Sequence, residues 1–253
     1  MYKLMNYFCR RSIASARFIS YNYFQNIIAS RIFFTAQGGN TTYEIVSIAK
    51  NEIVNCKNTG DVRKLSATLF RSIKDKSKEN IFSICEELLE CQLLCVAFDF
   101  AYRVKDQYDE NTFSLFENWL VKYVRGWGDC DDFCVHAFGE LIYQRPELTD
   151  NLIAWTAREE FWMRRAASVI LFVSIKKNKY DEINLFQICD ILMNDKHKLV
   201  LKGYGWMLKI LSVKEPELVF EYLMKNKLTI PKLAYRYAMQ KMDADKKMIL
   251  LSK

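Results

Sequence analysis

The sequence predicts an all-α protein of stacked helix pairs, an α–α superhelix with a concave face. Glycine and proline are scarce, at 8 and 3 of 253 residues, which is unusual for the short-turned strands of β-sandwiches and barrels. Hydrophobic residues make up 51% of the chain, enough for a sizeable core. From residue 43 onward, helical patterns follow one another across short junctions, as in helical-repeat arrays.

The individual helices are expected, in chain order, at residues 43–57, 61–73, 77–90, 91–105, 111–124, 130–144, 147–159, 160–175, 181–193, 196–213, 216–226 and 230–242. Three aspartates are expected to cap helix N-termini, because their side chains accept hydrogen bonds from free amides: Asp109, Asp181 and Asp195. Three prolines fall where a first turn tolerates them: Pro146, Pro216 and Pro231. The repeats share a pattern rather than letters, so a compact helical bundle is the alternative fold.

The first 40 residues differ in composition from the rest of the chain. They hold five basic residues and no acidic one, and they end in a loop-like Gln-Gly-Gly-Asn at 37–40. This composition is typical of an organelle-directed leader. We expect residues 1–40 to lie outside the domain, which then spans 41–253; the alternative is an additional amphipathic helix.

The formal net charge of +7 is distributed unevenly along the chain. Without the five basic residues of 1–40, 32 Lys and Arg face 30 Asp and Glu, so net charge alone does not indicate nucleic-acid binding. From residue 196 onward, however, 13 basic residues face 5 acidic ones, whereas 41–195 holds 19 against 25. One end of the domain is therefore expected to present a basic face.

Eight cysteines occur without a CxxC motif and with only two histidines. The pairs Cys91/Cys95 and Cys130/Cys134 have helical i, i+4 spacing, but buried free thiols in a reducing compartment are the better interpretation, so we expect no metal and no cofactor. No stretch stays apolar for the ~18 residues of a membrane span. The protein is expected to be soluble and intracellular and to have no membrane partner; a bacterial source would place it in the cytoplasm or nucleoid, and an organelle-directed leader is the alternative.

Two arginines stand in an otherwise apolar helix. The segment FWMRRAASVILFVSI, 161–175, is hydrophobic nearly all round, which predicts a buried helix, yet Arg164 and Arg165 lie in its first turns. Burying an unpaired guanidinium costs several kcal/mol, on the order expected for ions at low dielectric. At least one arginine must therefore reach water, a ligand phosphate or a carboxylate such as Glu159 or Glu160.

The segment LVLKGYGWMLKILSV, 199–213, places Lys202, Trp206 and Lys209 on one stripe of a helix. Gly203 and Gly205 interrupt this helix at a cost of about 1 kcal/mol each relative to alanine. These glycines could admit a backbone or a ligand, with the lysines meeting anions and the indole meeting a flat surface. The alternative is a core tryptophan flanked by lysines that extend to solvent.

The segment GWGDCDDFC, 126–134, sets a tryptophan beside three carboxylates. Trp127 and Asp131 are four residues apart, so they point the same way if the helix begins close to Trp127. Asp129 is expected to cap this helix, and Asp132 is expected to face solvent. Asp131 is the candidate functional carboxylate.

Together these segments resemble the AlkD family of DNA alkylation-repair glycosylases, which are built of HEAT-like helical repeats. The motifs that carry the resemblance occur in matching order: Trp127-x-x-x-Asp131, Trp162-x-x-Arg165, and Gly-Trp at 205–206 followed by KEPELVFEYL at 214–223. The resemblance runs over most of 43–245 and is strongest from Val121 to Tyr222. It implies a HEAT-like repeat fold with a concave DNA-binding face.

The resemblance also implies roles for single residues. In that family an aromatic residue and an aspartate face the damaged nucleotide, an arginine contacts the DNA backbone, and a tryptophan completes an aromatic cleft. By position these are Trp127, Asp131, Arg165 and Trp206. The family often has a further aromatic on an early helix, where this sequence has Arg63.

The expected activity is excision of N3- or N7-alkylated purines from duplex DNA by hydrolysis of the N-glycosidic bond. An alkylated purine is cationic and leaves as a neutral base, so no general acid is needed. The barrier lies in oxocarbenium character at the sugar, which an anionic Asp131 can stabilise while Trp127 and Trp206 meet the positive charge with their ring faces. The resemblance further implies that the base can remain stacked.

The expected partner is duplex DNA with alkylated bases, bound by a monomer. Phosphates are expected to meet a set of basic side chains on the concave face: Arg164, Lys176, Lys177, Lys179, Lys202 and Lys209. Two alternative functions remain. One is a helical-repeat module that binds DNA or protein without catalysis, and the other is a scaffold that does not bind DNA.

Overall fold

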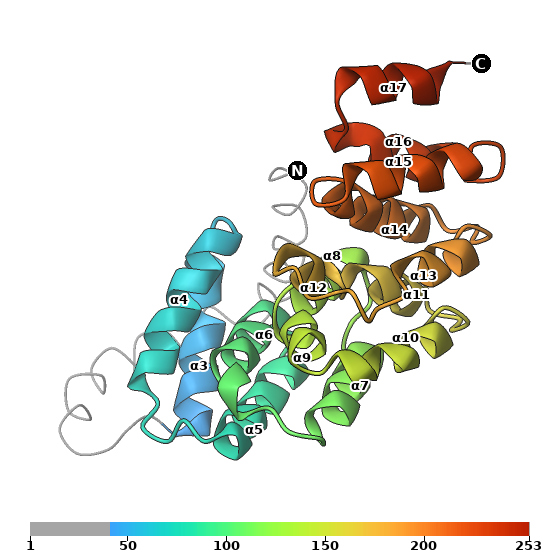
Figure 1. Ribbon diagram of the computed structural model, residues 1–253. Coiled ribbons are helices and arrows are strands. Elements are labelled where there is room, and N and C mark those ends of the chain that lie inside the picture. The colour runs from blue at the N-terminus through green and yellow to red at the C-terminus, as the bar shows by residue number, and fades with distance from the viewer. Residues whose placement is uncertain (1–40, 253) are drawn as a thin grey trace. The chain divides into compact units, whose positions relative to one another are not determined.

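The computed structural model describes residues 41–252, which form α-helices and short 3₁₀ helices and include no β-strand (Figure 1). This confirms the predicted all-α class. The expected leader, residues 1–40, lies outside the described residues. No helix within 41–252 is long and apolar enough to cross a membrane. The chain divides into two compact units, and the boundary along the sequence lies between Tyr108 and Asp109.

The first unit is described from Thr41 to Tyr108 and contains α3 (Thr42–Glu52), η2 (Ile53–Asn55), α4 (Thr59–Ser72), α5 (Lys78–Glu90), α6 (Leu94–Arg103) and η3 (Lys105–Gln107). In this unit, α3 and α6 each pack against both α4 and α5. Local sequence sets their ends. Thr41 and Glu44 form a reciprocal capping box, Asn58 caps α4, and Gln92 turns the chain between α5 and α6 with a positive φ of 60°.

The second unit contains α7 (Thr112–Lys122), α8 (Trp127–Cys134), α9 (Ala137–Gln144), η4 (Pro146–Thr149), α10 (Asp150–Trp155), α11 (Phe161–Val169), α12 (Phe172–Lys176), α13 (Leu185–Leu192), α14 (Lys198–Leu211), α15 (Pro216–Lys225), α16 (Lys232–Ala238), η5 (Met239–Lys241) and α17 (Ala244–Leu251). Aromatic side chains of α7, α8, α9 and α10 pack against one another in its core, Phe116 contacting Trp119, Phe133 and Phe138, and Phe138 contacting Trp155.

Four helices of the second unit pack in a row that is not consecutive in the sequence. Helix α8 packs on α11, α11 on α14, and α14 on α16. Of the intervening helices, α9 packs on α12, α15 packs on α17, and α13 packs against α11 and α14 of the row. The row carries most of the residues that the sequence analysis singled out, so side chains more than 30 residues apart in the chain become neighbours.

The prediction of one helix at 130–144 is wrong, because the chain forms two helices there. Helix α8 ends at Cys134, and His136 has φ −126° and ψ −99°, outside the helical region. Gly139 permits the close return of α9, since a Cβ at this position would lie 2.2 Å from the Cys134 carbonyl oxygen and 2.8 Å from Val173 Cγ2. The helix expected at 160–175 is likewise divided into α11 and α12.

Other expected boundaries also need correction. The helix expected at 147–159 is η4 followed by α10, the one at 230–242 is α16 followed by η5, and α17 was not expected. None of the three aspartates is an N-cap: the caps of α7, α13 and α14 are Asn111, Asn184 and His197. The prolines lie as expected, with Pro146 opening η4, Pro216 opening α15, and Pro231 directly before α16.

Candidate functional site

Helix α8 begins at Trp127, with Gly126 as its N-cap residue. Trp127 and Asp131 therefore lie one turn apart in the same helix, and the condition for their sharing a face is met. The Trp127 ring is half-buried, whereas Asp131 is only 8% exposed. The helix thus presents an aromatic ring at the surface and a carboxylate behind it.

Asp131 forms a bidentate ion pair with Arg165 of α11. Arg165 Nε donates to Asp131 Oδ1 at 2.7 Å, and Nη2 donates to Oδ2 at 2.8 Å. Arg165 Nη1 also donates to the Leu199 carbonyl oxygen of α14. The guanidinium carbon lies 6.0 Å from the Trp127 ring centroid. One arginine therefore joins α8, α11 and α14 and brings Trp127, Asp131 and Arg165 into one cluster.

Both charges of this pair are withdrawn from water. Arg165 is 4% exposed, so it offers little surface to a DNA phosphate, the contact that the sequence resemblance implied. Burial raises the pKa of the Asp131 carboxyl, and the Arg165 guanidinium opposes that rise. The bidentate contact uses one lone pair on each carboxylate oxygen and leaves others available. The Asp131 side chain keeps 12% of its surface exposed, which is an edge that a ligand can approach.

Gly203 of α14 makes room for this arginine. A Cβ added at Gly203 would lie 3.1 Å from Arg165 Cγ, 3.2 Å from Nη1 and 3.2 Å from Ser168 Oγ. Such distances are shorter than ordinary van der Waals contact. The group that approaches Gly203 is therefore the Arg165 side chain, and not the ligand or backbone that the sequence suggested.

Trp206 lies three residues beyond Gly203 on α14 and is half-buried. Its ring meets Phe172 edge-on, with centroids 4.5 Å apart and an interplanar angle of 77°, and Lys209 Nζ lies 6.0 Å from its centroid. Trp206 is thus joined to the Asp131 cluster through α14.

The two lysines of α14 surround a residue that the sequence analysis missed, Tyr237 of α16. Lys202 Nζ and Lys209 Nζ lie 6.0 and 5.6 Å from its ring centroid. Lys209 is only 4% exposed, and its Nζ donates to Gln240 Oε1 at 3.1 Å. No sequence signal pointed to Tyr237, because its position depends on the packing of α16 against α14.

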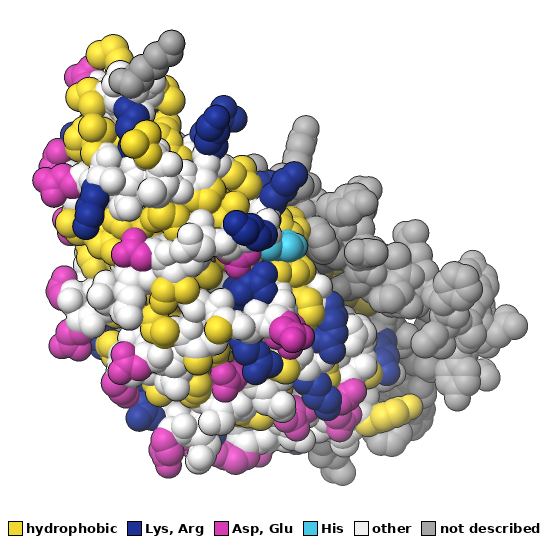
Figure 2. Space-filling model, turned by 90° about the vertical axis from the view of Figure 1, so that its right-hand side faces the viewer, with side chains coloured by type: hydrophobic (Ala, Val, Ile, Leu, Met, Phe, Trp, Pro, Cys, Tyr) yellow, Lys and Arg dark blue, Asp and Glu magenta, His cyan; other side chains and the backbone are white. Residues whose placement is uncertain are grey.

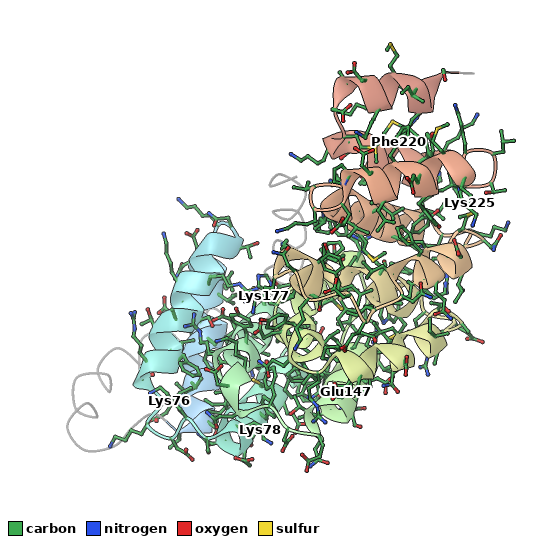
Figure 3. All side chains as sticks on the ribbon, viewed as in Figure 1. Lys76, Lys78, Glu147, Lys177, Phe220 and Lys225 are labelled. Carbon is green, nitrogen blue, oxygen red and sulfur yellow. The ribbon has the colours of Figure 1, made fainter. Side chains whose placement is uncertain are left out.

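Two other expected phosphate contacts form ion pairs within the protein. Arg164 Nε lies 2.6 Å from Asp195 Oδ2, so its carboxylate partner is Asp195, and Glu159 accepts from Arg164 only through its main-chain carbonyl. Lys177, labelled in Figure 3, lies 2.8 Å from the buried Glu140 and 4.0 Å from the Tyr143 ring centroid. These cations are therefore partly neutralised before any DNA binds.

The remaining two expected contacts are exposed. Lys176 ends α12, and Lys179 follows it with its Nζ 5.3 Å from the Tyr143 ring centroid. Figure 2 shows lysine and arginine side chains gathered in a band through the middle of one face. Acidic side chains are more frequent toward the left and lower margins of that face.

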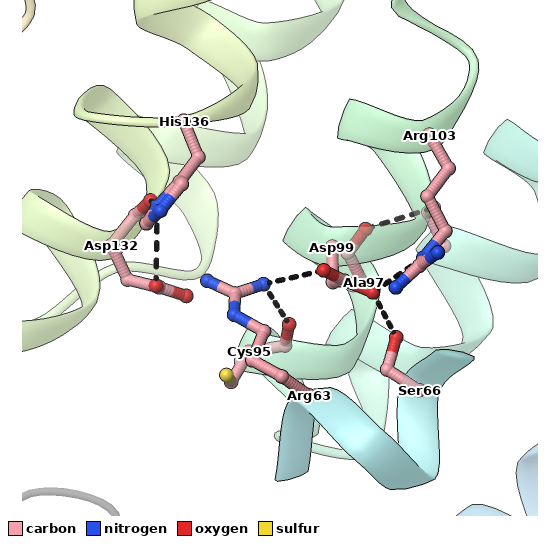
Figure 4. A network of polar contacts seen from close by, with 9 residues as sticks. Arg63, Ser66, Cys95, Ala97, Asp99, Arg103, Asp132 and His136 are labelled. Atoms are coloured by element: carbon pink, nitrogen blue, oxygen red, sulfur yellow. Dashed lines mark hydrogen bonds and ion pairs between the residues drawn. The ribbon is translucent and has the colours of Figure 1, made fainter. Parts of the chain in front are cut away.

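The two other carboxylates of α8 do not lie where the sequence analysis expected. Asp129 is the third residue of the helix rather than its cap, and burial, followed by the charge of Asp132, raises the pKa of Asp129 to about 6. Asp132 is buried rather than solvent-facing. Its Oδ1 lies 3.5 Å from His136 Nδ1, one turn further along (Figure 4).

Arg63, which stands where the AlkD family often has an aromatic residue, belongs to a polar network of the first unit (Figure 4). Its Nη1 donates to Asp99 Oδ1 at 3.1 Å and to the Cys95 carbonyl oxygen at 3.3 Å. Asp99 also accepts from Ser66 and, at 2.7 Å, from Arg103 Nε. Arg63 thus helps to hold α4 against α6.

The cysteine pairs form no metal site in the part of the chain that the structure describes, where no group of three or more His, Cys, Asp or Glu could hold a metal ion. Cys130 and Cys134 are buried. Cys130 Sγ donates to the Trp162 carbonyl oxygen at 3.3 Å, and burial raises its pKa well above the ordinary value. This thiol is therefore a packing group between α8 and α11.

Residues 51–242, most of the described chain, match the family described as "DNA alkylation repair enzyme". The chain belongs to this family of DNA alkylation repair enzymes. The match includes the row of helices from α8 to α16 and all of the residues that form the Asp131 cluster. Membership of this family establishes that the protein is an enzyme with a role in the repair of alkylated DNA.

A solved structure supports the fold of this DNA alkylation repair family member. The structure described as "Predicted DNA alkylation repair enzyme from Enterococcus faecalis" has a TM-score of 0.63 and 20% sequence identity. The match covers 80% of this chain and 95% of that chain. It confirms the α–α superhelical repeat fold. A comparison with curated proteins found no match.

Proposed function

We propose that this family member is a DNA glycosylase that excises cationic N3- or N7-alkylated purines from duplex DNA. The observation that carries the proposal is the Asp131 carboxylate, held by Arg165 beside the half-buried Trp127 ring. The alkylated base leaves as a neutral molecule, so the main demand on the enzyme is to stabilise positive charge at the sugar. A preorganised carboxylate next to an aromatic ring meets that demand.

Arg165 has a positioning role in this proposal. Its two donors fix the plane of the Asp131 carboxylate, so the anion need not reorganise when charge develops at the sugar. Its third contact, to the Leu199 carbonyl oxygen, ties the orientation of that carboxylate to α14, the helix that carries Trp206. Trp127 and Trp206 then pack against the damaged nucleotide.

The proposed substrate, duplex DNA, is bound by a single chain. One chain carries all four residues of the proposed site: Trp127, Asp131, Arg165 and Trp206. Basic side chains hold the phosphates, among them the exposed Lys176 and Lys179 and the half-buried Lys202, with no dependence on base identity. The DNA backbone would then position the lesion, and the cluster around Asp131 would act on it.

A second candidate function, binding of alkylated DNA without excision, is favoured by one observation. Arg165 already compensates the charge of Asp131, which weakens the field that this carboxylate projects toward a substrate. A single-turnover assay on duplex DNA containing N7-methylguanine separates the two functions. Release of the free methylated base supports the glycosylase, whereas tight binding with no released base and no abasic site would support the binding protein.

A further inference from the structure

Two lysines of the second unit lie over one aromatic ring, and a third lysine acts on one of them. Lys202 and Lys209 of α14 both lie over Tyr237 of α16, at 6.0 and 5.6 Å from its centroid. The third, Lys241 of η5, is close enough for its charge to act on Lys209. Among residues 41–252, no Asp or Glu forms an ion pair with any of the three.

The charge of Lys209 is the exceptional one, because it is buried and has no counter-ion among residues 41–252. An ammonium has three donors, and Lys209 gives one of them to the neutral Gln240 side chain at 3.1 Å. Arg165, which is equally buried, is matched by Asp131. A buried cation without an anion costs several kcal/mol, on the order set by its lost hydration.

The electrostatics of Lys209 agree with this geometry. Burial lowers the pKa of Lys209, and the charge of Lys241 lowers it further. Both causes would be reversed by an anion placed among the lysines, since it would replace lost hydration and shield one ammonium from another. Gln240 is exposed, so its side chain can swing aside for such an anion.

A second glycine of α14 builds this arrangement. A Cβ on Gly205 would lie 2.8 Å from the Ala234 carbonyl oxygen and 3.0 Å from Tyr237 Cβ. The glycine therefore allows α16 to approach α14 closely enough to set Tyr237 between the two lysines.

We propose that Lys202 and Lys209, which both lie over Tyr237, form a binding site for one backbone phosphate of the damaged DNA strand, together with Lys241 of η5, which packs on α14. This site rests on the proposed function. Lys209 lies six residues along α14 from Gly203, which is roughly 9 Å at 1.5 Å per residue. That separation is too long for Lys209 to meet the sugar that faces Asp131 and suits a phosphate that flanks it. Trp206 lies between Gly203 and Lys209 on α14, so its ring would separate the lesion from this phosphate.

The first experiment measures binding to undamaged and N7-methylguanine duplexes by fluorescence anisotropy over a series of salt concentrations. Lys202→Gln and Lys209→Met should each weaken binding to both duplexes and reduce the slope of log K against log salt by roughly one. The matched control is Lys225→Gln, which removes an exposed lysine of α15. We expect this control to leave the slope unchanged. An equal decrease in the control would show general charge attraction and overturn the site.

The stability of Lys209→Met supplies a second readout. Methionine removes the buried charge and keeps the apolar stem, so the melting temperature should rise or stay level while DNA affinity falls. A lower melting temperature would show that the ammonium stabilises the fold through Gln240 and the aromatic rings. That result would overturn the phosphate site.

A single uncharged methylphosphonate, moved along the damaged strand, locates the phosphate. At one position next to the lesion it should weaken wild-type binding and leave Lys202→Gln unaffected, because the same contact is already absent. If the methylphosphonate and Lys202→Gln weakened binding additively at every position of the methylphosphonate, the proposal would be overturned. Melting in inorganic phosphate and in chloride at equal ionic strength tests for a free ion: a phosphate-specific stabilisation that Lys202→Gln removes, without any position-dependent effect of the methylphosphonate, would show a free-anion site and overturn the assignment to DNA. Since none of these measurements needs excision, their failure is distinguishable from failure of the glycosylase.

Discussion

Arg165 holds both carboxylate oxygens of Asp131, at 2.7 and 2.8 Å, across 34 residues of sequence. Both residues are at least nine-tenths buried. Breaking such a pair by removing one partner leaves a buried, uncompensated charge and typically costs about 3–5 kcal/mol. The pair therefore serves the stability of the second unit as well as the proposed chemistry, and each mutation in it needs two measurements.

Asp131→Asn should lower the rate of N7-methylguanine excision by about 10² to 10³, because it deletes one preorganised charge. The amide oxygen can accept from one Arg165 donor, but the NH₂ group faces the other, and Arg165 is left buried without its counter-ion, so we expect a loss of stability of about 3–5 kcal/mol. Single-turnover rates and thermal melts measure the two effects. Asp129→Asn is the control for the rate. Wild-type excision by Asp131→Asn, or slower excision by Asp129→Asn, would contradict the proposed role.

Arg165→Gln should destabilise the protein by about 3–5 kcal/mol and reduce excision, since Asp131 remains buried without its counter-ion. The salt dependence of DNA binding should stay nearly unchanged because this guanidinium faces Asp131 rather than a phosphate. A double-mutant cycle with Asp131→Asn should show a coupling energy of about 0.5–3 kcal/mol. Additive effects of the two mutations would contradict a shared role.

The two glycines of α14 predict an order of stability. Alanine favours a helix by about 1 kcal/mol over glycine, but a Cβ at either position meets neighbours. At Gly203 the neighbours are side-chain atoms of Arg165 and Ser168, whereas at Gly205 they include Ala234 backbone atoms. We expect Gly205→Ala to be the more destabilising, by about 1–3 kcal/mol. Urea titrations test this order, and equal stability of both variants with the wild type would refute it.

Asp129 predicts a pH-dependent stability. Its folded pKa of about 6 lies above its ordinary 3.8, so the folded chain binds this proton more tightly than the unfolded chain does. The stabilising contribution is full below pH ~4 and is lost as the pH rises through about 6. Asp129→Asn should therefore stabilise the protein at pH 7, on the order of 1–3 kcal/mol, and have little effect at pH 4. Equal melting shifts at both pH values would refute this origin.

Lys177 separates structural from DNA-binding cations. Its ammonium contacts Glu140, whose side chain is 5% exposed, so Lys177→Gln should destabilise the protein by leaving that carboxylate buried without its partner. The slope of DNA binding against salt should change less than in Lys202→Gln. Melts and salt titrations of both variants give the comparison. A larger slope change in Lys177→Gln would return this lysine to the DNA interface.

Much of the fold could be predicted because its signals are local. Scarce glycine and proline and continuous helical patterning indicated the all-α class, and the i, i+4 spacing of Trp127 and Asp131 indicated a shared face before their helix was located. The division between α8 and α9 could not be predicted, because Cys134 and Gly139 approach each other through packing against Val173. Local helix propensity carries no information on that contact.

The sequence by itself determined the all-α class, the family resemblance and the identity of Trp127, Asp131, Arg165 and Trp206 as candidates. Only the tertiary structure decided which charges meet: Arg165 with Asp131, Arg164 with Asp195, and Lys177 with Glu140. It also decided that Lys209 is buried beside Tyr237 with no carboxylate of the described residues as its partner. The physical reason is that a charge is neutralised by whatever lies within a few ångströms, and helices 30 residues apart reach that distance only when they pack.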